Sequence, residues 1–246
     1  MGARETYRAM ASHYDAWLTA LGGDFSKLVA PRLDQVLARH RIKRGRFLDL
    51  GCGTGSLLAL YRARSTALAG VDASPEMLAV AKQRLGRDAT LLVGRLDAIP
   101  LRKKWDVITC FYDTLNHLTD RAALAAAFRE VSRLLSARGV FVFDTNNRHC
   151  YQALWQSTSI VKTKDATISV TSHFVESASV GTSVITISPV VGPRVTAELR
   201  ERCYDDADIC ALLEAASLNV RTAKPINPFA PGDIQPIKTF WVTTRA

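Results

Sequence analysis

The alternation of apolar and amphipathic stretches divides the chain into two parts near residue 147. Before that point, short apolar runs alternate with stretches in which apolar residues recur every three or four positions. The short runs indicate buried strands, and the periodic stretches indicate amphipathic helices. The predicted strands are 47–50, 68–71, 90–93, 105–111 and 139–144, and the predicted helices between them are 56–61, 74–85 and 121–136. Regular alternation of strands and helices implies a parallel sheet.

The two ends of the chain follow other patterns. Two helices are predicted before the first strand, over 4–20 and 24–40, with Gly22 and Gly23 between them. After residue 147, apolar and polar residues alternate around a turn near Gly181, which is typical of antiparallel strands with one solvated face. The predicted elements of this part are strands at 166–175, 183–191 and 195–203, a helix at 205–216, a proline-rich loop at 224–236 and a strand at 238–244.

Composition is that of an ordinary soluble protein, with 48% hydrophobic and 22% charged residues. No apolar stretch approaches the length of a membrane span, and the N-terminal residues lack the apolar core of a secretory signal. We therefore expect a cytoplasmic protein with no membrane partner. The five cysteines form no Cys-x-x-Cys pair, which favours reduced thiols over a disulfide frame or a zinc site.

The net charge of +9 is compatible with a nucleic-acid partner, an acidic small substrate or no specific partner. Its densest run, residues 39–46, falls at a predicted helix end, where cations complement the helix dipole. The run also precedes the first strand and so lies at the edge of the sheet away from a ligand. We interpret it as a solvated helix end, and expect no nucleic-acid partner.

A glycine-rich turn follows the first predicted strand. Gly51, Gly53 and Gly55 allow the backbone to turn tightly and to approach a ligand, and the helix that follows presents free amide donors. A dinucleotide fingerprint would place its third glycine one residue later, at Ser56. The second strand ends at Asp72, where an acid can accept hydrogen bonds from both hydroxyls of a ribose.

The segments FLDLGCGTG and GVDASPEML resemble the cofactor-binding half of class I S-adenosylmethionine-dependent methyltransferases, over about residues 10–145. The resemblance implies that S-adenosylmethionine is the cofactor. It places an acid, Asp97, against the adenine amino group with Leu96 beside the ring, although Asp97 could also be only a turn residue. The predicted cofactor-binding residues are Tyr14, Asp49, Gly51, Cys52, Gly53, Gly55, Asp72, Ala73, Met77, Leu96, Asp97 and Phe111.

With this topology, we expect an α/β fold: a doubly wound, mostly parallel seven-stranded sheet with an antiparallel β insertion after the fifth strand. The 246 residues suffice for one large domain. Within a single domain over 1–246 we predict N-terminal helices at 1–41, a cofactor-binding core at 46–145, an insertion covering the acceptor site at 148–203, and a return helix with the last strands at 204–246.

The segment after the fourth strand, residues 112–117, is expected to face the substrate, because ligands bind beyond the carboxyl ends of strands where strand order reverses. His117 is the best candidate base there, since its pKa lies near neutrality. Amino-sugar N,N-dimethyltransferases resemble the chain at this position, where they have histidine or tyrosine, and in a Tyr-Asp pair matched by Tyr14 and Asp15. The resemblance implies that Tyr14 lies over the cofactor and reaches its methionine end or the acceptor, so His117 and Tyr14 are the candidate catalytic residues. His117 could instead cap a helix, and Tyr14 could be part of an amphipathic cap helix.

The other candidate site residues are Asp113 and Asn116, which lie near His117 in the sequence, and the remaining histidines. Asp113 and Asn116 either bind a polar acceptor or stabilise the turn. The other histidines, at positions 13, 40, 149 and 173, show no metal-ligand spacing, so we predict no metal site. His149, after the fifth strand, is a distant second candidate base.

Three kinds of function remain to be compared. The resemblance favours a methyltransferase of secondary metabolism that acts on a small molecule at nitrogen, with oxygen or carbon acceptors as alternatives. A nucleic-acid methyltransferase of the kind that modifies base amines would usually have Asn or Asp followed by Pro-Pro and an aromatic after the fourth strand, where this chain has Tyr-Asp-Thr-Leu-Asn-His. The third kind is a Rossmann-type oxidoreductase, which the glycine spacing disfavours, or a cofactor-binding module without catalysis. Acceptor identity, the number of methyl groups and the oligomeric state are not predicted.

Overall fold

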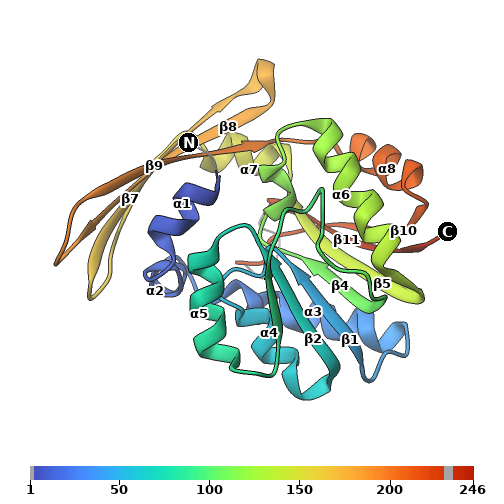
Figure 1. Ribbon diagram of the computed structural model, residues 1–246. Helices are drawn as coiled ribbons and strands as arrows, with labels where there is room; N and C mark the ends of the chain where they lie inside the picture. The colour runs from blue at the N-terminus through green and yellow to red at the C-terminus, as the bar shows by residue number, and fades with distance from the viewer. Residues whose placement is uncertain (1–2, 230–234) are drawn as a thin grey trace.

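The computed structural model describes residues 3–229 and 235–246. Its main feature is a seven-stranded sheet with strand order β10-β11-β5-β4-β1-β2-β3 (Figure 1). All neighbours are parallel except at β11, which runs antiparallel to both β5 and β10. The strands are β1 Gly45–Leu50, β2 Ser65–Asp72, β3 Thr90–Val93, β4 Trp105–Cys110, β5 Leu135–Asn146, β10 Leu218–Ile226 and β11 Lys238–Arg245. The expected doubly wound sheet is confirmed, and its order reverses between β1 and β4 as predicted.

Helices cover both faces of this sheet, because its central strands are apolar on both sides. The side chains of α3 Phe25–Arg39, α4 Ser56–Tyr61 and α5 Pro75–Leu85 form one core with Phe47 and Val107. On the other face, α6 Arg121–Leu134 and α8 Asp206–Ala215 pack on Leu48 and Ile108. The core is therefore two apolar layers, and the loops at the carboxyl ends of β1, β2 and β4 are left free to form a site. No helix in the described part of the chain is long and apolar enough to cross a membrane.

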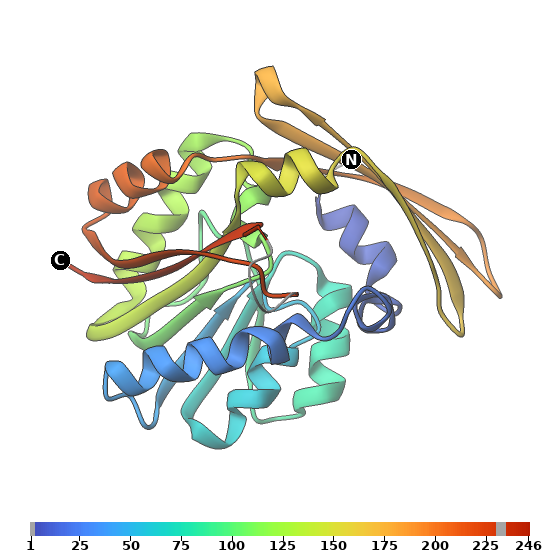
Figure 2. The same ribbon diagram turned by 180° about the vertical axis from the view of Figure 1, so that it is seen from behind.

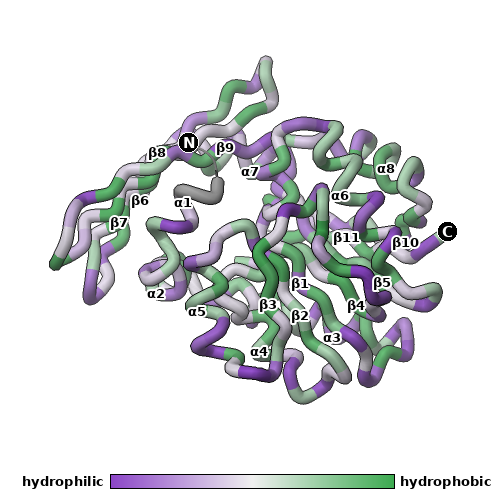
Figure 3. Tube along the Cα trace, in the orientation of Figure 1, coloured by the Kyte–Doolittle hydropathy of each residue, from purple (hydrophilic) through white to green (hydrophobic). Residues whose placement is uncertain are grey.

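A separate antiparallel sheet with strand order β6-β7-β8-β9 follows β5, as predicted for the insertion. Figure 2 shows it as a long arched ribbon to one side of the main sheet, with α1 Ala3–Met10 and α2 Tyr14–Ala20 beside it. Its apolar face packs on Met10, and Figure 3 shows hydrophobic and hydrophilic residues alternating along its strands. The elements are α7 Arg148–Leu154, β6 Thr158–Lys162, β7 Ala166–Val175, η3 Glu176–Ala178, β8 Val180–Pro189 and β9 Val195–Arg202.

Several predicted boundaries are wrong, and the fold explains two of them. The helix predicted over 4–20 is broken between Met10 and Tyr14, so that α1 can bury Met10 on the second sheet while α2 reaches the glycine turn. The prediction also missed β6. At the other end of the chain, the loop predicted over 224–236 begins later, because β10 continues to Ile226 through Pro225, which an edge strand tolerates.

Two glycines are required by the close packing of neighbours. Gly139 follows α6 and lies in β5, as the strand predicted at 139–144 implies, and an added Cβ there would meet the Trp105 carbonyl. The turn predicted near Gly181 is formed at Glu176–Ala178, and Gly181 itself lies in β8, where an added Cβ would fall 2.5 Å from the Trp155 ring. Close approach of a neighbour requires glycine at both positions.

Candidate active site

The glycine turn after β1 has the left-handed backbone that its sequence predicts. Gly51, Gly53 and Gly55 have φ angles of 68°, 51° and 76°. An added Cβ on Gly51 would collide with the side chain of Thr114, and one on Gly55 would press on α5. At Gly53, by contrast, an added Cβ would meet no protein atom within 4 Å. The backbone there faces open space, which fits the close approach of a ligand.

Asp72 fixes the end of β2 against this turn. Its Oδ2 accepts a hydrogen bond from the Gly53 amide at 2.8 Å, and its Oδ1 accepts one from the Ser74 amide at 2.9 Å. Burial raises the pKa of Asp72, while these backbone donors oppose the rise. Ser74 in turn caps α5 by accepting from the Met77 amide, as the sequence predicts. Asp72 is thus a positioned acceptor at the mouth of a cavity.

That cavity has a volume of about 450 Å³, within the range of small-molecule sites. A smaller cavity of about 70 Å³ adjoins it and shares Tyr14, Gly51, Gly53 and Phe111. We call the two together the donor cavity. The predicted residues that line its larger part are Tyr14, Gly51, Gly53, Asp72, Ala73, Met77, Leu96, Asp97 and Phe111, and Asp49 and Cys52 line the smaller part. Gly55 lines neither, because it packs on α5. The ligand contacts of all these residues stay predictions.

Two acids on this side have opposite environments. Asp49 is buried and accepts a hydrogen bond from Thr109 Oγ1 at 2.6 Å, and burial raises the pKa of Asp49 to about 7. Asp97 pairs with the guanidinium of Arg95, at 2.6 Å from Nη2, and this hydrogen bond lowers the pKa of Asp97. Asp97 is therefore a carboxylate at neutral pH, whereas Asp49 is near its midpoint.

Asp15 ties α2 to the glycine turn. Its Oδ1 accepts from Thr54 Oγ1 at 2.7 Å, and its Oδ2 pairs with Arg84 of α5. Tyr14, the preceding residue, consequently lies over the donor cavity, with its ring centroid 6.0 Å from that of Tyr7. The side chain of Tyr14 thus lines the donor cavity, and its contact with a cofactor and its role stay predictions.

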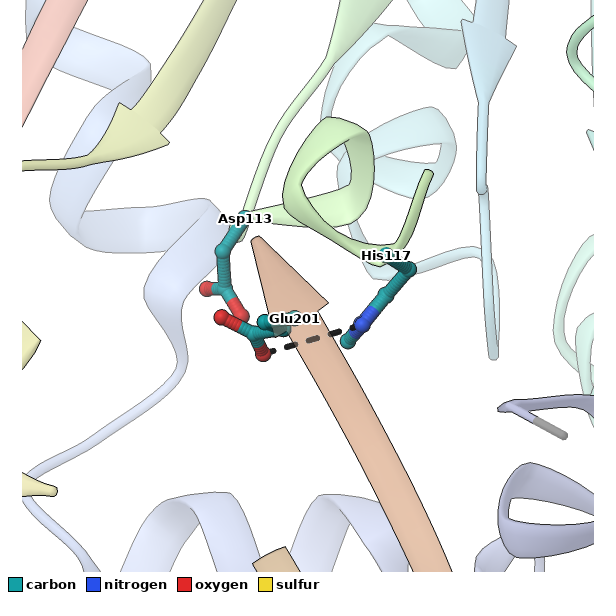
Figure 4. Close-up of side chains that lie close together, drawn as sticks. All are labelled: Asp113, His117 and Glu201. Atoms are coloured by element: carbon teal, nitrogen blue, oxygen red, sulfur yellow. Dashed lines mark ion pairs between the residues drawn. The ribbon is translucent and has the colours of Figure 1, made fainter. Parts of the chain in front are cut away.

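His117 lies on the short helix η2, Thr114–His117, which follows β4. Its Nε2 is 2.8 Å from the hydroxyl of Tyr7, and its Nδ1 is 3.6 Å from Oε1 of Glu201 on β9. Figure 4 shows that the side chains of His117, Asp113 and Glu201 converge. Burial lowers the pKa of His117, against a smaller opposing effect of Asp113, so the imidazole is neutral at pH 7. A neutral imidazole can accept a proton.

A buried lysine holds the adjacent acids. Lys238 of β11 is 2% exposed, and its Nζ lies 2.9 Å from Asp113 Oδ1 and 3.4 Å from Asp144 Oδ1. Although burial opposes it, this charge keeps the pKa of Asp113 below its usual value. Tyr112 and Asp113 have φ angles of 59° and 53°, and their amides donate to Asp144. The hydrogen bonds to Asp144 hold this strained backbone in place.

Glu201, Tyr7 and Lys238 were not among the predicted site residues. Glu201 is 1% exposed, and its Oε2 accepts from Tyr151 at 2.9 Å and from Asn146 at 3.1 Å. Burial, and then the charge of Asp113, raise the pKa of Glu201 well above its usual value. One signal was available in the sequence: Glu201 occupies an inward position in the alternation from Val195 to Cys203, where the other members are apolar.

Asp113, His117 and Glu201 also meet a geometric requirement for binding a metal ion, because one ligand atom from each lies within 4.8 Å of the others. However, the ammonium of Lys238 already neutralises Asp113, and burial favours the protonated form of Glu201. A divalent cation needs deprotonated ligands and would be repelled by Lys238. We therefore assign no metal to this cluster.

A second cavity of about 200 Å³, which we call the acceptor cavity, lies between the main sheet and the insertion. Tyr7, Tyr14 and Tyr112 line both this cavity and the donor cavity. The strands β7, β8 and β9 supply an apolar wall, and the buried indole Nε1 of Trp17, which also lines the cavity, has no hydrogen-bond partner. Its polar floor consists of Asp113, Asn146, Glu201 and Lys238. The insertion is thus one wall of a cavity that meets the donor cavity at three tyrosines.

Comparisons with known proteins agree with this geometry. Residues 47–139 match the family model described as a methyltransferase domain. Over 135 residues, the chain is 30% identical to the dTDP-3-amino-3,6-dideoxy-alpha-D-glucopyranose N,N-dimethyltransferase of Streptomyces fradiae, covering 55% of this chain and 52% of that protein. It is 27% identical to the dTDP-3-amino-3,4,6-trideoxy-alpha-D-glucopyranose N,N-dimethyltransferase of Streptomyces venezuelae, covering 67% and 69%. The chain spans between 52% and 66% of the length of four curated relatives that it matches.

The likeness in structure extends over the whole chain. An S-adenosylmethionine-dependent methyltransferase of Clostridium acetobutylicum superposes with a TM-score of 0.83, at 23% sequence identity, covering 98% of this chain and 99% of that one. At this identity the likeness establishes the fold. The fold includes the antiparallel strands after β5, so the insertion is part of a shared architecture.

Proposed function

Since the chain belongs to the class I S-adenosylmethionine-dependent methyltransferases, we propose that it transfers a methyl group from S-adenosylmethionine to a nitrogen of a small molecule. We further propose that the acceptor is an amine of secondary metabolism, because two Streptomyces relatives are named as N,N-dimethyltransferases of amino sugars. S-adenosylmethionine, when bound, supplies an activated methyl group on a positively charged sulfur. The residues of this chain have to bind and orient the methyl donor and the acceptor, and to exclude water from the reacting atoms.

The observation that carries the proposal is the wall shared by the donor and acceptor cavities. Asp72 would accept hydrogen bonds from the ribose hydroxyls, and Leu96 with Asp97 would contact the adenine. The adenosine would then point the methionine end toward Gly51 and Tyr14. A nucleophile in the acceptor cavity would reach the methyl group past the tyrosines. Such alignment supplies much of the rate of a displacement.

A nitrogen acceptor fits the charges around His117. An amine must lose a proton before or after it accepts a methyl group, and a neutral imidazole beside Tyr7 can take up that proton. Apolar side chains on β7 and β8 would cover the rest of the acceptor and exclude water. An oxygen acceptor would need a stronger base, since a hydroxyl is far less acidic than an ammonium.

Calorimetry followed by a transfer assay tests this function. We expect the protein to bind S-adenosylmethionine and not NAD, and to transfer labelled methyl groups to members of a panel of amino sugars and simple amines. Mass spectrometry of the products would locate the methyl group. NAD binding without S-adenosylmethionine binding would overturn the proposal, and methylation at oxygen or carbon alone would overturn the choice of nitrogen.

Replacing His117 with asparagine tests its role separately. If His117 accepts the proton, turnover at saturating cofactor should fall by about 10²-fold, the usual contribution of a general base. The affinity for S-adenosylmethionine should stay the same, because the contacts of the His117 ring are with Tyr7 and Glu201 and not with the glycine turn or Asp72. Unchanged turnover would leave His117 with a structural role only.

A nucleic-acid acceptor receives no support from the placement of the basic run. Arg39, Arg41, Lys43 and Arg44 are exposed at the end of α3 and before β1, whereas the glycine turn follows the other end of β1. RNA binding with a steep salt dependence would be the finding that revives this alternative.

A further inference from the structure

We propose that Tyr7, His117 and Glu201 form one relay that accepts the proton of the acceptor amine, with the Tyr7 hydroxyl facing the amine and Glu201 positioning His117. The relay rests on the proposed function, because it serves the transfer of a methyl group to nitrogen. Its three members come from α1, η2 and β9, and so join the N-terminal helix, the main sheet and the insertion.

The first step concerns Tyr7, whose side chain lines both the donor and the acceptor cavity. Its hydroxyl lies 2.8 Å from His117 Nε2, with the two rings edge to face at 5.6 Å between centroids. Burial raises the pKa of Tyr7 well above its usual value, so the hydroxyl keeps its proton at neutral pH. A neutral phenol can donate to an imidazole nitrogen that has no proton, so the Tyr7 hydroxyl donates to His117 when Nε2 is unprotonated. Tyr7 is thus the member of the relay that an acceptor amine can touch.

The second step concerns the tautomer of His117. If Nε2 accepts from Tyr7, a neutral ring has its single proton on Nδ1. This Nδ1 is buried and has no hydrogen-bond partner within normal distance, and Glu201 Oε1 lies 3.6 Å away. An unprotonated Nδ1 would place its lone pair against those of Oε1. Glu201 therefore favours the tautomer that leaves Nε2 free to receive a proton.

The third step explains why Glu201 itself presents an accepting oxygen. Its Oε2 is held by Tyr151 and Asn146, which fixes the direction of the carboxyl group. The carboxyl group of Asp113 is adjacent to that of Glu201 and is ionised because Lys238 is in contact with it. Burial favours the protonated form of Glu201, whose proton the Asp113 carboxylate can accept, so that Oε1 can remain an acceptor toward His117.

The transfer balances in protons and electrons. The lone pair of the acceptor nitrogen forms the new nitrogen–carbon bond as the carbon–sulfur bond breaks, and its electron pair stays on sulfur. The nitrogen then gives one proton to the Tyr7 oxygen while the Tyr7 hydroxyl proton passes to His117 Nε2. The positive charge ends on the imidazolium of His117, which faces Asp113 and Glu201. The carboxylate of Asp113 favours this charge, whereas the ammonium of Lys238, on the other side of Asp113, disfavours it.

Nitrogen-15 spectra of the histidine rings test the tautomer in the unmodified protein. We expect His117 at pH 7.5 to be protonated on Nδ1 and unprotonated on Nε2. In the Glu201→Gln variant this preference should weaken, because the amide can present either a donor or an acceptor to Nδ1. The opposite tautomer in the wild-type protein would overturn the relay without any variant having to fold.

Kinetics of single and double variants test whether the residues act together. Glu201→Gln and Tyr7→Phe should each lower kcat by about 10- to 100-fold, with unchanged calorimetric affinity for S-adenosylmethionine. The double variant should lose little more than either single variant, since residues that act as a unit are not additive. Glu198→Gln is the matched control, because Glu198 lies on the same strand but pairs with Arg200 at the surface, and it should keep full activity.

Two outcomes separate the relay from the proposed function. Losses that multiply in the double variant, or full activity of Glu201→Gln, would remove the relay and leave methyl transfer intact. Absence of transfer to every amine by the wild-type protein, despite binding of S-adenosylmethionine, would remove the function on which the relay depends. Circular dichroism of each variant verifies that the fold persists.

Discussion

The two sides of the site are built in different ways. On the donor side, Gly51, Gly53 and Asp72 lie within 22 consecutive positions, and backbone amides form most of their contacts. On the acceptor side, residues as distant in sequence as Tyr7, Asp113 and Lys238 converge, and their contacts join side chains, including the ion pair of Lys238 with Asp113. A site made of a local turn is encoded by a short motif, whereas a site made of paired charges depends on the whole fold.

The same contrast holds for the way each side stabilises its acids. Asp72 is held by two backbone amides, and Asp97 by an exposed arginine. Asp113 and Asp144 depend on one buried ammonium, that of Lys238. Loss of one amide leaves Asp72 its other donor, and loss of its arginine leaves Asp97 near solvent, but loss of Lys238 leaves two buried carboxylates without a counterion. The acceptor side should therefore be the more sensitive to substitution.

The largest effect is expected for Lys238→Met, which keeps the length of the side chain and removes its charge. Breaking a buried ion pair from one side typically destabilises by about 3–5 kcal/mol. We expect a loss of this size in the free energy of unfolding measured with urea. The double variant Lys238→Met with Asp113→Asn should recover part of the loss, since it removes one of the unpaired charges. Equal stability of Lys238→Met and wild type would contradict the contrast between the two sides.

The second prediction concerns Asp49, a buried donor-side acid without a cation. The pKa of Asp49 is raised to about 7, whereas the pKa of an aspartate in an unfolded chain is about 3.9. Between these values the folded state binds more protons than the unfolded state, so Asp49 lowers stability as pH rises from 4 to 7. Asp49→Asn removes this penalty and can still accept from Thr109.

The gain from Asp49→Asn over wild type should accordingly increase between pH 4 and pH 8. A shift of three pKa units corresponds to about 4 kcal/mol, and partial relaxation on ionisation reduces this, so we expect about 2–4 kcal/mol at pH 8. Thermal or urea unfolding at both pH values measures it. A gain that is the same at pH 4 and pH 8 would show that Asp49 does not titrate in this range.

The third prediction compares two donor-side acids in one measurement. Asp72→Ala should weaken binding of S-adenosylmethionine by about 100-fold, because it removes two charge-assisted hydrogen bonds and loosens the Gly53 amide. Asp97→Ala should weaken it by only about 5- to 10-fold, since a single contact to an amino group is worth about 1 kcal/mol. Calorimetry on both variants provides the ratio. A larger loss of affinity for the Asp97 variant than for the Asp72 variant would indicate that the nucleoside does not bind at the end of β2.

The sequence predicted the donor side well because its signals are local. The left-handed glycines, the Ser74 cap and the acid at the end of β2 each depend on neighbours within a few positions, and the structure places all of them as expected. Alternation of strands and helices predicted the parallel sheet, and the resemblance to class I methyltransferases implied the point at which strand order reverses. The packing at Gly139 and Gly181 was not predicted, because atoms of Trp105 and Trp155, which exclude a side chain there, come from distant elements.

The acceptor side could be predicted only in part. His117 was found because it follows the fourth strand, but its partners Tyr7 and Glu201 lie 110 and 84 positions away, where no local pattern connects them. Glu201 could have been noticed as an acid in an apolar phase, although its partner could not. Lys238 begins a strand and resembles any polar residue at a strand end until the fold buries it. The spacing of residues along the sequence does not predict which side chains pair across the fold.

The smallest effect is expected from chelation, and it tests how the acceptor side balances its charge. Asp113, His117 and Glu201 are close enough to bind a divalent ion, but Lys238 already supplies a positive charge to Asp113. Dialysis against EDTA should therefore leave methyl transfer within about twofold of its initial rate, since no step depends on metal-bound ligands. Rescue by added Mg²⁺ or Mn²⁺ after a large loss would contradict this assignment. It would imply that Lys238 moves away from Asp113 when an ion binds, and that both sides of the site are completed by ligands from solution.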